Sequence, residues 1–153
     1  MRTIKFRGKK VTNGVWAYGS LVYLEKNGAA IYVQTDNGSV KVMDLVYVHP
    51  DTVCQFTGFL DKNGKEIYEG DVLRSDTYPY SCIGDKKRDN YFGVIEWNEN
   101  EAAFYIVTIK NPKSSVKGIS DGISDYLSKS ALQDFEVIGN IHDDEWKQFR
   151  DHL

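Results

Sequence analysis

QFTGFLDKNGKEIYEGDVLR (Gln55–Arg74) combines a turn, two short apolar runs and an acidic Glu-Gly-Asp triplet. Asn63-Gly64 is a strong turn signal, because both residues tolerate positive φ. Gly70 lies between two carboxylates and marks a bend or a bulge. The stretch therefore predicts a structural hairpin followed by a bent strand, with a binding rim as the second interpretation.

The side chains around this bend have structural roles in the predicted hairpin. Ile67 and Val72 are expected to anchor opposite sides of the bend at Gly70. Asp61 or Glu66 is expected to accept hydrogen bonds from amides of the turn, as Asx turns do. Glu-Gly-Asp followed by an apolar strand also resembles the entry to SH3-like barrels, which is an analogy of fold only.

The same turn chemistry recurs along the chain between short apolar and aromatic runs. Ten Tyr, seven Phe and three Trp accompany only three Pro, which is the composition of a β protein with tight turns. The predicted strands are Thr3–Arg7, Val15–Leu24, Ile31–Val33, Val40–Val48, Val53–Phe59, Ile67–Tyr68, Val72–Leu73, Tyr91–Trp97, Ala103–Ile109 and Phe135–Ile141.

Helical patterns are confined to the last third of the chain. Ser124–Gln133 is predicted as a short helix with Ser124 as its cap. The clearest helix is predicted from Asp143 onward, with acidic residues at its start and basic residues in its second half. Its apolar face, which includes Trp146, is expected to dock on the barrel or on a partner.

These elements predict a mainly β fold, either a small β-barrel or a sandwich, with a short C-terminal helix. One portion of it is expected to resemble an SH3-like barrel. The length of 153 residues fits a single domain over residues 1–153. Two small β subdomains, about 1–60 and 61–153, are the alternative.

Charge and cysteine content bound the function classes. A net charge of −3 is not typical of a polyanion binder, although a local basic patch remains compatible with it. Residues 1–10 carry five basic side chains and no acid, which suits either a binding edge or the solvent face of an edge strand. Cys54 lies in an apolar run, which favours a buried structural thiol over a nucleophile that uses His49 as its base.

Paired carboxylates are the main candidate for chemistry. Glu69 and Asp71 flank Gly70, and residues two apart on a strand point to the same face, where they could bind a metal or share a proton. The alternative is that both acids lie at the rim of the bend in water. Phosphate-loop, zinc-helix and nucleophile-elbow motifs are not found in the sequence, and no cofactor is expected.

Nucleic-acid binding is the other candidate, because small barrels stack bases on exposed aromatic rings beside basic groups. Its basic loop is the segment Lys86–Arg88. The hypothetical binding surface consists of Tyr68, Arg74, Lys86, Lys87, Arg88 and Tyr91.

The opening stretch also resembles the central signature of the YopX family of phage and prophage proteins. The family pattern, Thr-Gly-Leu-x-Asp-Lys-Asn-Gly-x-Glu-Ile-Tyr-Glu-Gly-Asp-Ile, is matched over Thr57–Val72, with Phe59 in place of Leu. IKFRGK (Ile4–Lys9) is similar to the opening strand of the family, and FEVIGNIHDD (Phe135–Asp144) is similar to its closing block. The signature residues here are Gly58, Asp61, Asn63, Gly64, Ile67, Tyr68, Gly70 and Asp71.

The resemblance implies a compact, mainly β accessory protein of a phage or prophage, and it carries no established activity or catalytic residue to transfer. We therefore expect a non-enzymatic module that binds an unknown host or phage protein, or that forms a homo-oligomer if it has a self-complementary face. A nucleic-acid-binding barrel and a small metal-dependent enzyme that uses Glu69 and Asp71 are the alternatives. Because no leader or bilayer-length apolar run is visible, the cytoplasm of the bacterial host is the expected location, and no membrane partner is expected.

Overall fold

The computed structural model describes residues 3–36, 41–76, 91–109, 124–129 and 131–147. The chain divides into two compact units, Met1–Gly58 and Phe59–Leu153. The two-subdomain alternative predicted from the sequence has its boundary near residue 60, close to this division. That the two units are separate subdomains remains a prediction. Each unit is described by itself.

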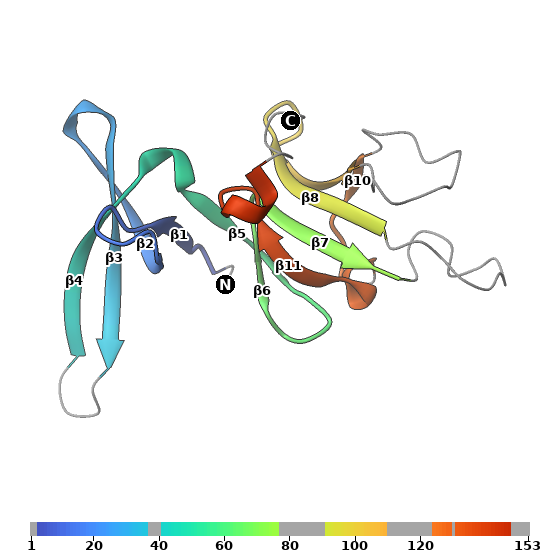
Figure 1. Cartoon of the computed structure of the whole chain (residues 1–153), viewed down its shortest axis with the longest axis horizontal. Coiled ribbons are helices and arrows are strands. Elements are labelled where there is room, and N and C mark those ends of the chain that lie inside the picture. The colour runs from blue at the N-terminus through green and yellow to red at the C-terminus, as the bar shows by residue number, and fades with distance from the viewer. Residues whose placement is uncertain (1–2, 37–40, 77–90, 110–123, 130, 148–153) are drawn as a thin grey trace, which may run out of the picture. The chain divides into compact units, whose positions relative to one another are not determined.

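The first unit is an antiparallel sheet (Figure 1). Within this unit the strand order is β4-β3-β2-β1-β5, and β5 ends two residues past the division. The bounds are β1 Phe6–Lys9, β2 Trp16–Leu24, β3 Gly28–Asp36, β4 Lys41–Val48, β5 Cys54–Leu60 and, in the second unit, β6 Glu66–Tyr68. Two single-turn 3-10 helices, η1 (Glu25–Asn27) and η2 (Pro50–Thr52), connect strands.

Alternation along the strands gives this sheet a buried face and an outer face. In β3, Ala29 and Ile31 belong to the buried cluster, and they pair with Val48 and Val46 of β4. Tyr32, the residue after Ile31, therefore lies on the opposite, outer face. The buried cluster consists of Ala17, Ala29, Ile31 and Val48, packed against Phe6, Leu21, Val33, Val46 and Val53.

The second unit contains a five-stranded antiparallel sheet in the order β10-β9-β8-β7-β11. Its strands are β7 Asp71–Ser75, β8 Tyr91–Asn98, β9 Ala103–Ile109, β10 Ser124–Tyr126 and β11 Glu136–Asn140. The 3-10 helix η3 (Ala131–Asp134) precedes β11. The hairpin of β8 and β9 joins the two strands that the sequence predicts on either side of residues 98–101.

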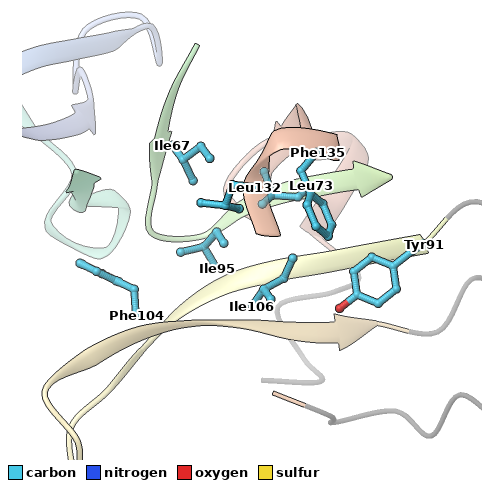
Figure 2. Close-up of a cluster of buried hydrophobic side chains, with 8 residues drawn as sticks. All are labelled: Ile67, Leu73, Tyr91, Ile95, Phe104, Ile106, Leu132 and Phe135. Atoms are coloured by element: carbon cyan, nitrogen blue, oxygen red, sulfur yellow. The ribbon is translucent and has the colours of Figure 1, made fainter. Parts of the chain in front are cut away.

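Apolar side chains cover both faces of this second sheet. Ile95 of β8 packs in one cluster with Leu132 and Phe135, whereas Val94 packs on the opposite face with Val72. Figure 2 shows the first cluster: Ile67, Leu73, Tyr91, Ile95, Phe104, Ile106, Leu132 and Phe135. The prediction that Ile67 and Val72 anchor opposite sides of the bend is confirmed, because they belong to different clusters.

The mainly β prediction is confirmed, but the closed barrel is wrong, because the described strands form two open antiparallel sheets. The described residues contain no α-helix, so the helix predicted at Ser124–Gln133 is also wrong. Its first residues pair with β9 as the edge strand β10, and ladder hydrogen bonds outweigh a weak helical preference there.

The predicted C-terminal helix is a 3-10 turn over residues 144–147, and residues 148–153 lie outside the described part. A turn at residues 141–143 separates it from β11. The docking of its apolar face is confirmed for Trp146, which packs against the cluster that contains Val72 and Val94. Across the described residues, no helix is long and apolar enough to cross a membrane.

Candidate functional site

The signature hairpin is held together by the carboxylate of Asp61. Its Oδ1 accepts hydrogen bonds from the amides of Asn63 (2.8 Å) and Lys65 (2.9 Å). Its Oδ2 accepts one from the amide of Val137 in β11 (3.0 Å). The predicted Asx-type bonding is therefore confirmed for Asp61, and the same carboxylate also ties the hairpin to the closing block of the sequence.

A second buried network ties the bend to that block. Asp71 is fully buried, and its Oδ2 accepts a hydrogen bond from the amide of Tyr68 (2.8 Å). The side-chain amide of Asn140 donates to Asp71 Oδ1 and to the carbonyl oxygen of Glu69, both at 3.1 Å. The prediction that Asp71 lies at a rim in water is wrong, because its side chain is buried. The hydrogen bonds from Tyr68 and Asn140 compensate the carboxylate for its lost contact with water.

The glycines of the signature permit this geometry. Gly58, Gly64 and Gly70 have φ values of 92°, 80° and 73°, which L-residues rarely adopt. At Gly70, a Cβ atom would also meet Asn140 Nδ2 at 3.1 Å and Ile141 Cγ1 at 3.0 Å. The signature therefore accounts for backbone geometry and buried hydrogen bonds, which is a structural role.

The described residues do not assemble the predicted nucleic-acid surface around Lys86–Arg88. Tyr68 and Tyr91 are only 1% and 6% exposed, so the expectation of free stacking rings at these positions is wrong. Arg74 Nε donates to Glu136 Oε1 at 2.7 Å, so this cation is already paired. Lys86, Lys87 and Arg88 lie outside the described residues, and their role stays a prediction.

Ionisable groups near the bend include one perturbed carboxyl group. Burial, with the negative charge of Glu69 as a smaller cause, raises the pKa of Glu96 above its usual value of 4.5. Within the described ranges, no three His, Cys, Asp or Glu side chains gather as a metal site would require. The metal-dependent use of Glu69 and Asp71 stays a prediction that gains no support from this geometry.

Glu136 shows the opposite perturbation. Its hydrogen bond from Arg74 is the main cause that lowers its pKa, and Lys62 Nζ lies 3.4 Å from Oε2. Cys54 is buried and its thiol donates to the carbonyl oxygen of Thr52 at 3.3 Å, as a structural thiol would. The Glu136 carboxylate and the Cys54 thiol therefore both have partners within the protein.

The first unit, in contrast, exposes large apolar side chains on the outer face of its sheet. We define the outer strip as Tyr32, Met43, Leu45 and Tyr47, which are 40%, 54%, 43% and 61% exposed. The β3–β4 register places Tyr32 opposite Leu45, and the Tyr32 hydroxyl donates to Met43 Sδ at 2.8 Å. The strip is thus contiguous over two strands, as binding surfaces often are.

A row of cations lies on β1 of the same sheet and on the residue before it. We define the basic ladder as Lys5, Arg7 and Lys9. Arg7 Cζ and Lys9 Nζ lie 4.3 and 5.3 Å from the centroid of the Trp16 ring, within the range of cation–π contacts. The Lys5 ammonium lies 6.0 Å from the Tyr18 ring. Aromatic rings therefore help to position the cations of this ladder.

The outer strip is the feature that sequence reasoning missed. The sequence predicts Val40–Val48 as a strand and assigns neither of its faces to solvent. The signal that could have found the strip is the regular alternation Met43, Leu45 and Tyr47, with Asp44 between the first two.

The arrangement defines the class: a mainly β protein whose signature hairpin is held by structural hydrogen bonds and whose exposed apolar surface lies on the first sheet. The YopX protein family matches residues 5–145, and the chain therefore belongs to the YopX family. Comparison with curated proteins finds no match.

A solved structure has a similar fold. The crystal structure of protein EF1440 from Enterococcus faecalis superimposes with a TM-score of 0.55 over 95% of this chain and 97% of that chain. The two sequences are 17% identical, so the likeness shows the fold alone.

Proposed function

We propose that this YopX protein is a non-enzymatic, phage-encoded accessory module that binds a partner protein through the outer face of its first sheet. The observation that carries the proposal is the exposed outer strip. Tyr and Met are enriched in protein interfaces, and Met adapts its shape to varied partners. The partner is a protein of the bacterial host or of the phage.

The charge on this face indicates the chemistry of the partner. Lys5 and Lys9 are half-buried, Lys9 ends β1 and Lys5 directly precedes it, whereas the strip lies on β3 and β4. The amide of His49, two residues beyond Tyr47, donates to the carbonyl oxygen of Lys9 (2.9 Å), so the ladder lies beside the C-terminal end of the strip. A partner segment with acidic side chains beside apolar ones would match both, and its charge would speed association.

Three matched variants test this proposal. Leu45→Glu places a charge in the strip, Lys9→Glu reverses one charge of the ladder, and Tyr23→Ser removes an 81% exposed ring from the opposite face. Tagged proteins would capture partners from host and phage-infected lysates, with and without nuclease, and captured proteins would be quantified by mass spectrometry. We expect one protein to be retained by the wild type and Tyr23→Ser and lost by at least tenfold with Leu45→Glu.

Two outcomes would overturn the proposal. Retention that is equal for all variants would show that the strip is not the binding surface. Capture of no protein by any variant would leave the strip without a protein partner in these cells. Circular dichroism of each variant would show that the sheet is intact before the capture is interpreted.

The basic ladder supports a second candidate, binding of single-stranded nucleic acid. Its weakness is that the cations of Arg7 and Lys9 already occupy positions over Trp16, where a base would stack. Fluorescence anisotropy with labelled oligonucleotides would test it, using Lys9→Glu and the exposed Lys26→Glu as a matched pair. Binding that falls steeply with salt and is lost only with Lys9→Glu would favour this candidate.

A further inference from the structure

We propose that β4 is a self-association edge, at which two copies of the chain pair their β4 strands antiparallel about a two-fold axis at Met43. The edge differs from the outer face that the proposed function uses. The inference therefore does not rest on that function, and a dimer would leave Tyr32 and Tyr47 of both outer strips away from the pairing at Met43.

The strand order places β4 at the end of its sheet, with β3 as its neighbour on one side. Its other side is closed only at the C-terminal end within the described residues. There, Tyr47 accepts a hydrogen bond from the amide of Val11 (3.1 Å), and the amide of His49 donates to Lys9 (2.9 Å). Lys10 and Val48 form the isolated bridge between these two bonds.

These bonds show which backbone groups of β4 point away from β3. Tyr47 and His49 use outward groups, and the direction of N–H and C=O alternates along a strand. Met43 and Leu45 therefore also present their N–H and C=O groups outward, and so does Lys41 at the start of the strand. The structure shows no backbone partner for this outward side at positions 41–45 among the described residues.

Only one two-fold register uses this open stretch fully. An axis at Leu45 would require the outward groups of Tyr47, which already bond to Val11. An axis at Asp44 would place the two Asp44 side chains directly opposite each other, and like charges at such a position are destabilising. An axis at Met43 pairs position 41 with 45, 43 with 43 and 45 with 41.

The register at Met43 satisfies all three outward residues of both copies. Each hydrogen-bonded pair of an antiparallel ladder exchanges two bonds, so the dimer would form about six. The exposed side chain of Met43 would meet Met43 of the other copy, and Leu45 would lie opposite position 41 of that copy. Because the surface buried is small, the dimer is expected to be weak and to dissociate on dilution.

Proline provides a selective test of this edge. The N–H of Met43 points outward, so Met43→Pro removes a donor from the dimer without removing a bond to β3. Met43→Leu keeps the donor and serves as the matched control. In sedimentation experiments on a concentration series, the wild type and Met43→Leu should rise from the 17.5 kDa monomer toward twice that mass, whereas Met43→Pro should stay monomeric.

Cross-linking tests the register independently, and it does not depend on whether the proline variant folds. In a Cys82→Ser background, Met43→Cys should form a disulfide-linked dimer under mild oxidation, because facing Cα atoms in such a pair are about 5.5 Å apart. Asp44→Cys should cross-link at least tenfold less, since it would lie opposite position 42. A wild type that stays monomeric at all concentrations, or equal cross-linking of the two variants, would overturn the proposal.

Discussion

At the scale of single residues, two carboxylates of the signature hold the backbone together, in agreement with the structural hairpin that the sequence predicts. Asp61 and Asp71 accept hydrogen bonds from backbone amides nearby in the chain and from β11 residues about seventy positions later. The local half of this bonding follows from turn chemistry and was predictable. The bonds from β11 depend on which strand pairs with β7, and the local sequence pattern does not predict that pairing.

Replacing Asp61 tests its role. Asp61→Ala leaves the amides of Asn63, Lys65 and Val137 without their acceptor, which should lower the free energy of unfolding by about 2–4 kcal/mol. Asp61→Asn keeps one oxygen acceptor and should cost less. Urea denaturation would measure both. A loss below about 0.5 kcal/mol for Asp61→Ala would contradict a structural role.

Glu96 makes stability depend on pH in a definite direction. Its pKa is raised in the folded chain, so the unfolded chain ionises first as pH rises through 4.5. Stability is therefore lost as the pH rises from that value through the folded pKa, and the penalty is constant above it.

Glu96→Gln should remove this penalty. We expect it to raise the free energy of unfolding at pH 7 by about 0.5 kcal/mol, because partial exposure screens the charge. No gain is expected at pH 3, where both states are protonated. Thermal unfolding at a series of pH values would check this, and a gain of equal size at pH 3 would assign the effect to packing.

At the scale of elements, most strands were predictable and most ends were not. β2, β4, β5, β8 and β9 lie where alternating and apolar runs predict them, because strand preference and burial agree there. At the turn of residues 26–28, Lys26 and Asn27 have positive φ values, 59° and 62°, and Gly28 does not. The pairing of Leu24 with Gly28 fixes that turn one position earlier than the Asn-Gly pattern suggests.

The bend between β6 and β7 is the element most dependent on a single position. Gly70→Ala adds a Cβ atom at positive φ, where it also meets Asn140 and Ile141. Gly64→Ala has a similar φ but nothing within 4 Å of the added atom, so it isolates the backbone cost.

We expect Gly64→Ala to cost about 1–2 kcal/mol of unfolding free energy. Gly70→Ala should cost about 1 kcal/mol more, because its neighbours must move. Paired denaturation curves would measure the difference. Equal losses for the two variants would show that Asn140 and Ile141 accommodate the added methyl group freely.

At the scale of the whole molecule, composition predicted the class and missed the exposed surface. A net charge of −3 describes the chain as mildly acidic, while β1 carries a row of cations. Hydrophobic content likewise predicts buried strands, although the outer strip exposes four large side chains. Averages over a chain cannot show which face of a sheet remains uncovered, because that depends on which elements pack together.

The long-range bonds of the signature have a consequence for the time at which the protein can fold during its synthesis. The hydrogen bond from Val137 to Asp61 joins residues 76 positions apart, and the bond from Asn140 to Asp71 joins residues 69 positions apart. Neither bond can form until the second residue has been synthesised. A ribosome adding about 5–20 residues per second would need several seconds to make that segment. Throughout that interval, the two aspartates would lack their β11 donors. In contrast, the β1–β2, β2–β3 and β3–β4 pairings of the first sheet join residues that are near in sequence and are made before Asp61.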